Sequence, residues 1–193
     1  MHRKIIKASI FLPQKPPLRD LGFAPGINIL RGEQAQTAVR ILAGIFGDYC
    51  PGTVEAELCW QPGIRVFVSG GERTVFVDRV ELQGEDPAQK EKAFHKTRFL
   101  CRVMGPYVLD GAEPSVGFFG EGEGLLRKLR SLLEKPDRRP LFVYNFLERL
   151  DEAVDLQPIF EALNATGRQV FIAVPHYYNM KQLEEMPYDI HAL

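Results

Sequence analysis

The alternation of hydrophobic and polar positions predicts an α/β protein whose last third is its most regular part. Short apolar runs between polar or glycine-rich segments are typical of strands that are buried on both faces, as in a parallel sheet. Such runs occupy residues 27–30, 140–146 and 168–175. The last two flank a helical segment with short connections, which predicts a parallel βαβ unit.

Apolar residues at helical spacing predict several helices between these strands. One begins at Thr37 and ends before the "GDYCPG" segment. Pro158 interrupts a later helix and indicates a break or a restart there. The predicted helices occupy residues 37–46, 86–104, 124–135, 151–167 and 178–186.

Period-two alternation between residues 53 and 82 predicts an antiparallel meander. Its strands are expected at 53–60, 64–69 and 73–82, because Pro62-Gly63 and Gly70-Gly71 provide turns between them. Further strands are expected at 3–12 and 188–193, and one short strand within 105–124. Residues 13–26 contain four prolines and are predicted to form a loop. We expect a single domain over 1–193, with 53–82 as an antiparallel subdomain.

Bulk composition excludes several classes of protein. The 193 residues are 45% hydrophobic, which indicates a globular chain, and the formal net charge of −1 argues against a surface that is basic throughout. No apolar run is long enough to span a bilayer, and the N-terminus does not resemble a signal peptide, so we expect a cytoplasmic protein without membrane insertion. Three cysteines without C-x-x-C spacing indicate neither a zinc site nor a disulfide framework.

The segment "INILRGEQAQTAVRILAGIFG" has the build of a phosphate-binding loop: an apolar strand, a glycine, a short polar loop and an apolar helix. A P-loop needs G-x-x-x-x-G-K-[ST], in which backbone amides and the lysine bind phosphates and the hydroxyl binds Mg²⁺. Gly32 matches the first glycine. Thr37, Ala38 and Val39 stand at the second glycine, the lysine and the hydroxyl position. Three of the four determinants are therefore missing.

The order of elements resembles the ATPase head of the ABC superfamily, in particular the branch of RecF, SMC and related DNA-repair ATPases. The resemblance is clearest in "PGINILRGEQAQTAVRILAGIFG", which is similar to that branch's first strand, Walker A loop and first helix. The segment "RRPLFVYNFLERLDEAVDLQPIFEALNATGRQVFIAVPH" is similar to its Walker B strand, D-loop, following helix and switch strand. The resemblance implies a P-loop NTPase-like, mainly parallel sheet with helices on both faces and an added antiparallel meander.

The same resemblance assigns positions to the remaining catalytic elements. Tyr144 and Asn145 occupy the places of the Walker B aspartate and glutamate, and neither supplies a carboxylate. Asp151 matches the D-loop aspartate, and His176 falls near the switch histidine. The signature loop corresponds to "FFGEGEG" (118–124), which has no serine and places two glutamates before a helix, where they would repel a phosphate.

The candidate residues form the remnant of a nucleotide site rather than a working one. They are Gly32, Gln34, Gln36, Thr37, Arg40 and His176. We expect no catalytic residue, no metal site and no bound cofactor, with ATP and Mg²⁺ left as doubtful ligands. Plainer roles compete: Gly32 as a turn glycine, Asp151 as a helix N-cap, and His176 packed against neighbouring tyrosines.

The favoured function is a pseudo-ATPase that acts as a binding, scaffold or regulatory module. The resemblance implies a homodimer, or a heterodimer with an active ABC-type ATPase, and leaves DNA open as a partner. Basic residues such as Lys15, Arg19 and Arg138-Arg139 are candidates for a DNA-binding face, although solvated charge is the simpler interpretation. The alternatives are an atypical ATP-binding protein or NTPase with a non-standard P-loop, and a structural partner unrelated to DNA.

Overall fold

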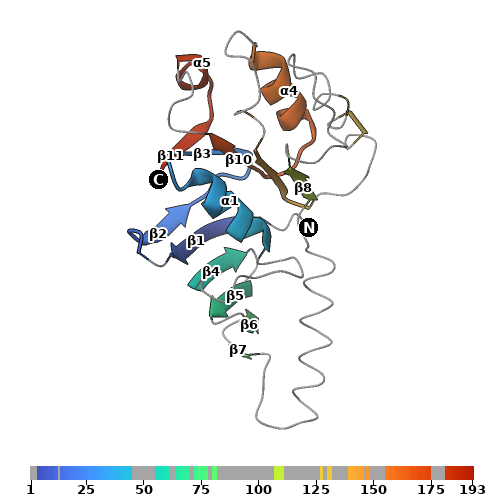
Figure 1. The fold of residues 1–193 in the computed structure, drawn as a ribbon. Helices are drawn as coiled ribbons and strands as arrows, with labels where there is room; N and C mark the ends of the chain where they lie inside the picture. The colour runs from blue at the N-terminus through green and yellow to red at the C-terminus, as the bar shows by residue number, and fades with distance from the viewer. Residues whose placement is uncertain are drawn as a thin grey trace. The chain divides into compact units, whose positions relative to one another are not determined.

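The structure, a computed structural model, describes a defined part of the chain (Figure 1). For the strands between residues 55 and 81 it describes the backbone alone, as it does at 107 and 110. The described residues are 4–12, 14–44, 55–60, 64–69, 72–77, 80–81, 107–110, 127, 130–131, 139–145, 147, 155–174 and 181–193.

The chain divides into two compact units. The antiparallel unit comprises Met1–Phe23 and Ile41–Pro106, and the parallel unit comprises Ala24–Arg40 and Tyr107–Leu193. The division falls inside the first helix, so neither unit is a continuous stretch of sequence. The expectation of a single domain stays a prediction.

A five-stranded, fully parallel sheet forms the centre of the parallel unit, in the order β11-β3-β10-β9-β8. This confirms the predicted parallel βαβ arrangement. It also places the short strand expected within 105–124 at one edge and the strand expected at 188–193 at the other. The strands are β3 (Ile27–Arg31), β8 (Tyr107–Asp110), β9 (Leu141–Tyr144), β10 (Val170–Val174) and β11 (Asp189–Ala192).

Apolar residues of both faces of this sheet are buried, as the continuous apolar runs predict. One face packs with α4 (Gln157–Ala165) and with Leu183 of α5 (Lys181–Glu184) in a single hydrophobic cluster. On the other face, Phe142 and Phe171 are register partners whose rings stack with centroids 4.9 Å apart. The cluster comprises Ile27, Ile29, Leu109, Leu141, Val143, Leu147, Leu156, Ile159, Phe160, Leu163, Val170, Ile172, Val174 and Leu183.

Helix α4 begins where proline predicts a restart. Pro158 lies in its first turn, where a missing N–H costs nothing, and the Asp155 carboxylate accepts a hydrogen bond from the Gln157 N–H at 3.0 Å. Gly167 follows the helix with φ +61°, and its N–H donates to the Asn164 carbonyl. The predicted end of this helix is thereby confirmed, while its predicted start at residue 151 lies outside the described residues.

A six-stranded antiparallel sheet forms the antiparallel unit, in the order β2-β1-β4-β5-β6-β7. It confirms the predicted meander, although the stretch expected as one strand at 73–82 is divided into two. The strands are β1 (Ile5–Phe11), β2 (Leu18–Gly22), β4 (Glu55–Trp60), β5 (Ile64–Ser69), β6 (Glu72–Val77) and β7 (Val80–Glu81).

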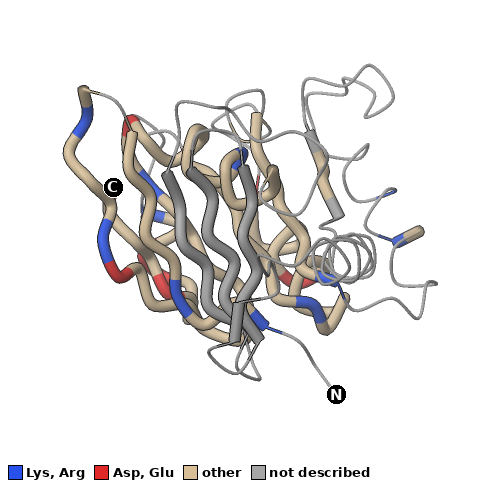
Figure 2. The backbone as a smooth tube through the Cα atoms, turned by 90° about the horizontal axis from the view of Figure 1, so that it is seen from below, with Lys and Arg blue, Asp and Glu red and all other residues tan. Residues whose placement is uncertain are grey.

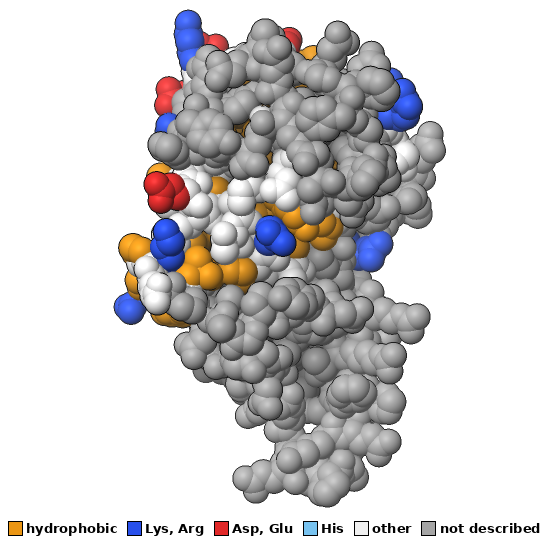
Figure 3. Space-filling view, in the orientation of Figure 1, with side chains coloured by type: hydrophobic (Ala, Val, Ile, Leu, Met, Phe, Trp, Pro, Cys, Tyr) orange, Lys and Arg blue, Asp and Glu red, His pale blue; other side chains and the backbone are white. Residues whose placement is uncertain are grey.

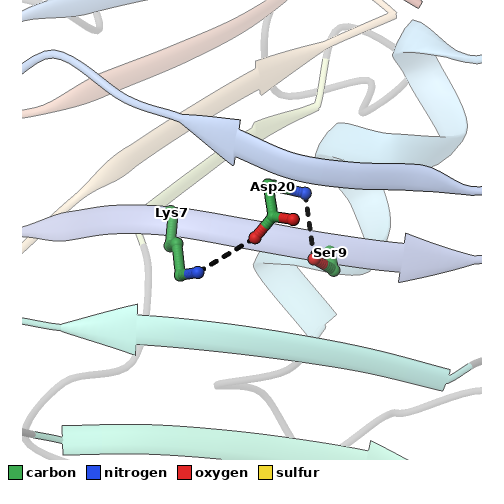
Figure 4. Close-up of polar contacts among 3 residues, drawn as sticks. All are labelled: Lys7, Ser9 and Asp20. Carbon is green, nitrogen blue, oxygen red and sulfur yellow. Dashed lines mark hydrogen bonds and ion pairs between the residues drawn. The ribbon is translucent and has the colours of Figure 1, made fainter.

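The prediction that residues 13–26 form only a loop was wrong, because β2 lies within them. Its prolines precede Leu18 or follow Gly22, so none removes an N–H from the strand. Asp20 adopts φ +50° beside an irregularity in the pairing with β1, and its N–H donates to the Ser9 hydroxyl at 3.0 Å (Figure 4). A bulged edge strand of this kind fits next to prolines where a central strand would not.

Two predicted helices are not tested by the described residues. The segment 86–104 lies outside them, and within 124–135 only residues 127, 130 and 131 are described, all three helical. None of the helices in the described part of the chain combines the length and hydropathy needed to cross a membrane.

Candidate functional site

The loop between β3 and α1 is three residues long, because α1 (Ala35–Gly44) begins two residues before the predicted start at Thr37. Gly32 leaves the strand with φ +126°, a value that only glycine adopts without strain. Its N–H donates to the Val174 carbonyl at 3.3 Å, and its carbonyl accepts from the Ala35 N–H at 3.2 Å. The polar backbone groups of Gly32 are thus used within the fold.

The early start of α1 determines where the Walker A positions point. Ala38 and Val39, at the lysine and hydroxyl positions, are both 0% exposed, whereas Thr37 is exposed. The Ala38 N–H donates to the Gln34 carbonyl at 2.8 Å, an intrahelical bond that fixes this turn. The two positions that would hold phosphate and metal in a P-loop therefore face the protein interior.

Two candidate residues of α1 meet the end of β9. The Gln36 Oε1 accepts a hydrogen bond from the Asn145 N–H at 2.9 Å. The Arg40 guanidinium carbon lies 5.9 Å from the centroid of the Tyr144 ring, within the range of a cation–π contact. The structure therefore brings α1 and the end of β9 together through these four residues.

Strand β11 continues the sheet beside this loop. Ala192 is the register partner of Arg31, and the Leu193 N–H donates to the Arg31 carbonyl at 2.7 Å. A Cβ added to Gly32 would clash with the Leu193 carbonyl oxygen. Gly32 is therefore required both by its backbone conformation and by the close approach of Leu193.

The remaining candidates are only partly placed. Gln34 is half-buried in the loop, and its side-chain oxygen is buried without a hydrogen-bond partner among the described residues. His176 lies outside the described residues, as do Asp151 and the predicted signature loop. Among the described residues, no group of His, Cys, Asp and Glu side chains could hold a metal ion.

A buried asparagine that the sequence pattern did not mark as special anchors the start of β3, the strand that leads to the loop. Asn28 is 0% exposed in β3, and its Oδ1 accepts from the Ala24 N–H at 2.7 Å. Its Nδ2 donates to the carbonyls of Ala24, Gly26 and Val170. Gln169 adds a second side-chain donor to the Ala24 carbonyl at 2.8 Å. The signal in the sequence was one amide residue within the apolar run "INIL".

Charge does not gather on one element of the described chain. Figure 2 shows the basic and acidic positions distributed over several elements. Lys7 forms an ion pair with Asp20 at 2.9 Å (Figure 4). The guanidinium of Arg19 lies over the Phe11 ring. Figure 3 shows a group of hydrophobic side chains over β1 and β2 with basic side chains at its margin. Ile6 in β1 is 40% exposed. The predicted DNA-binding face stays a prediction.

Comparison with solved structures bears on the fold. The chain is similar to an SMC head domain from Thermotoga maritima, with a TM-score of 0.53 and 13% sequence identity. The similarity covers 98% of this chain and 94% of that domain. The fold is P-loop NTPase-like. At this level of identity the match supports the expected fold class and says nothing of activity. No protein-family model and no curated protein matches the sequence.

Proposed function

We propose that this chain is a catalytically inactive counterpart of ABC-type ATPase heads that serves as a binding, scaffold or regulatory module. The observation that carries the proposal is the burial of Ala38 and Val39 in α1. Phosphoryl transfer depends on positioned cations around the phosphates, namely the P-loop lysine and a metal ion. Ala38 and Val39 carry neither an ammonium group nor a hydroxyl, and both are packed inside the protein, so α1 supplies neither the cation nor the metal ligand.

The Walker B strand end supports the same proposal. Tyr144 and Asn145 contribute no carboxylate, and both already contact α1 through Arg40 and Gln36. A metal ion needs hard oxygen ligands at this edge of the sheet, and a water nucleophile needs a general base. Two protein contacts stand where those groups would be required.

The corresponding partner is a second head domain. We propose that the chain pairs with itself or with an active ABC-type ATPase, and that DNA is a further candidate partner of that assembly. The likeness in fold to an SMC head domain over nearly the whole chain supports a head-like role. Sedimentation of the chain with and without duplex DNA at increasing salt distinguishes protein association from DNA binding. Contacts with DNA phosphates are expected to weaken steeply with salt.

The proposal is tested by titrating the full chain with Mg²⁺-ATP in a calorimeter and by recording its thermal unfolding with the same ligand. We expect no heat of binding and no shift of the unfolding temperature at millimolar ATP, with an ABC-type ATPase that has an intact Walker A loop as the positive control. Binding at micromolar ATP would overturn the proposal and favour the atypical nucleotide-binding protein.

A matched pair of arginine variants locates any binding that is observed. Arg40 and Arg19 each lie 5.9 Å from an aromatic ring centroid, but only Arg40 belongs to the candidate site. If ATP binds at that site, Arg40→Gln weakens binding while Arg19→Gln does not. Equal effects of the two variants would indicate nonspecific attraction of the nucleotide.

A further inference from the structure

Two contacts connect the same face of α1 to the end of β9. Gln36 and Arg40 are four residues apart, so their side chains are neighbours on the helix surface, about one turn apart. Gln36 reaches the backbone of Asn145, and Arg40 reaches the ring of Tyr144, the preceding residue. Two residues one turn apart on α1 thus meet two successive residues at the end of β9, which indicates a built junction.

The backbone at this junction is unusual. Asn145 adopts φ +54°, in the left-handed region that few residues other than glycine occupy, although asparagine tolerates it best. This residue directly follows β9. The Gln36 side chain supplies an acceptor at 2.9 Å for that N–H. The contact thus satisfies a backbone donor at the point where the strand turns away.

We infer that Gln36 is a built-in bridge that holds α1 to the end of β9 without any ligand, with Arg40 on Tyr144 as a second, weaker connection. In P-loop NTPases a metal ion joins these two elements, because the P-loop hydroxyl and the Walker B aspartate both bind it. Here a side-chain hydrogen bond joins them directly. The inference rests on the proposed function in one respect: the bridge takes the place of the metal only if no nucleotide site operates here.

The consequence is a junction that is held together when no nucleotide is bound. Such a junction suits a module that associates with its partner constitutively. Gln36 is accordingly a positioning residue, because it acts through the backbone of Asn145.

The test is residue-resolved amide hydrogen exchange of the full chain by NMR, with the Asn145 N–H as the reporter. Gln36→Met keeps the length of the side chain and removes the acceptor, so exchange at Asn145 is expected to rise about five- to tenfold. Gln36→Glu retains an acceptor oxygen and is expected to keep exchange slow, which a role in packing alone would not produce. Gln157→Met is the matched control, since Gln157 makes an exposed side-chain hydrogen bond on α4.

Two further measurements keep the inference open to refutation. Arg40→Met should raise exchange at Asn145 by a smaller factor, and it provides a test if Gln36→Met does not fold. Unchanged exchange at Asn145 in Gln36→Met would overturn the bridge while leaving the proposed function intact. Slower exchange of the wild-type chain on addition of Mg²⁺-ATP would overturn both, because a ligand would then complete the junction.

Discussion

The two units of this protein use polar side chains in opposite ways. In the antiparallel unit, the Lys7–Asp20 ion pair lies at the surface, with 50% and 73% of the two side chains exposed. In the parallel unit, Asn28 makes four hydrogen bonds at 0% exposure. When an exposed ion pair is broken, water solvates both charges. When a buried amide side chain is removed, the groups that it bonded to lose their partner and gain no water in its place.

The difference follows from sheet type. An antiparallel sheet can leave polar side chains on one face in solvent, and its edge strand β2 carries them. A parallel sheet is covered on both faces, so any polar side chain inside it must be fully bonded. Asn28 and Gln169 in the parallel unit therefore fix the backbone that leads into β3, whereas the exposed ion pair at the edge of the antiparallel unit constrains little.

The largest effect is expected for Asn28→Ala in the parallel unit. The substitution removes all four hydrogen bonds of a fully buried side chain, takes the acceptor from the Ala24 N–H and leaves a cavity, so it should lower the free energy of unfolding by about 2–3 kcal/mol. Denaturant titration measures it, with the exposed Asn164→Ala on α4 as the control. A loss no greater than that of the control would remove the distinction between the two units.

An intermediate, pH-dependent effect is expected for His191, which is half-buried in edge strand β11. Burial lowers the pKa of the His191 imidazole, and the nearby Asp189 carboxylate partly opposes this by raising it. The unfolded chain then binds more protons, so stability falls as the pH drops below the unfolded pKa of about 6.5 toward the lower folded pKa.

Unfolding curves between about pH 8 and about pH 5 measure this dependence, because this range extends about 1.5 pH units above and below the unfolded pKa of histidine. In His191→Gln, the part of the pH dependence that is due to this group should disappear. A variant whose stability follows pH as the wild type does would show that His191 has the same pKa in both states.

The smallest effect is expected for Lys7→Met in the antiparallel unit. Removal of an ion pair that is exposed on both sides should change the free energy of unfolding by less than about 0.5 kcal/mol. Denaturant titration at low and high salt measures the change, and the wild type should show little salt dependence from this pair. If Lys7→Met lowered the free energy of unfolding as much as Asn28→Ala, the contrast between the polar side chains of the two units would be wrong.

Local pattern accounts for the parts of the fold that were predicted correctly. The apolar runs that became β3, β9 and β10 are short and flanked by glycine or polar residues, so their type and pairing followed from burial on both faces. The alternating segments of the meander followed in the same way. Edge strand β2 was missed because its neighbouring prolines dominate the local signal, although they lie outside the strand.

The geometry of the site depended on contacts that no local pattern contains. The resemblance assigned the Walker A and Walker B positions, but the link from Gln36 to Asn145 joins residues 109 positions apart. The approach of Leu193 to Gly32 is equally remote in sequence. The start of α1 was predicted two residues too late. The prediction depended on the spacing of apolar residues, whereas a helix begins where its first hydrogen bonds form.

The position of β3 between β10 and β11 has a consequence for biosynthesis. Asn28 bonds to Val170, 142 residues later in the chain, so β3 leaves the ribosome long before either neighbour exists. At about 5–20 residues per second, the wait for residue 170 lasts about 7–28 s. During that time the apolar segment "INIL" has no strand to pair with. The pairing of β3 with its neighbours therefore has to wait until the last third of the chain has been translated.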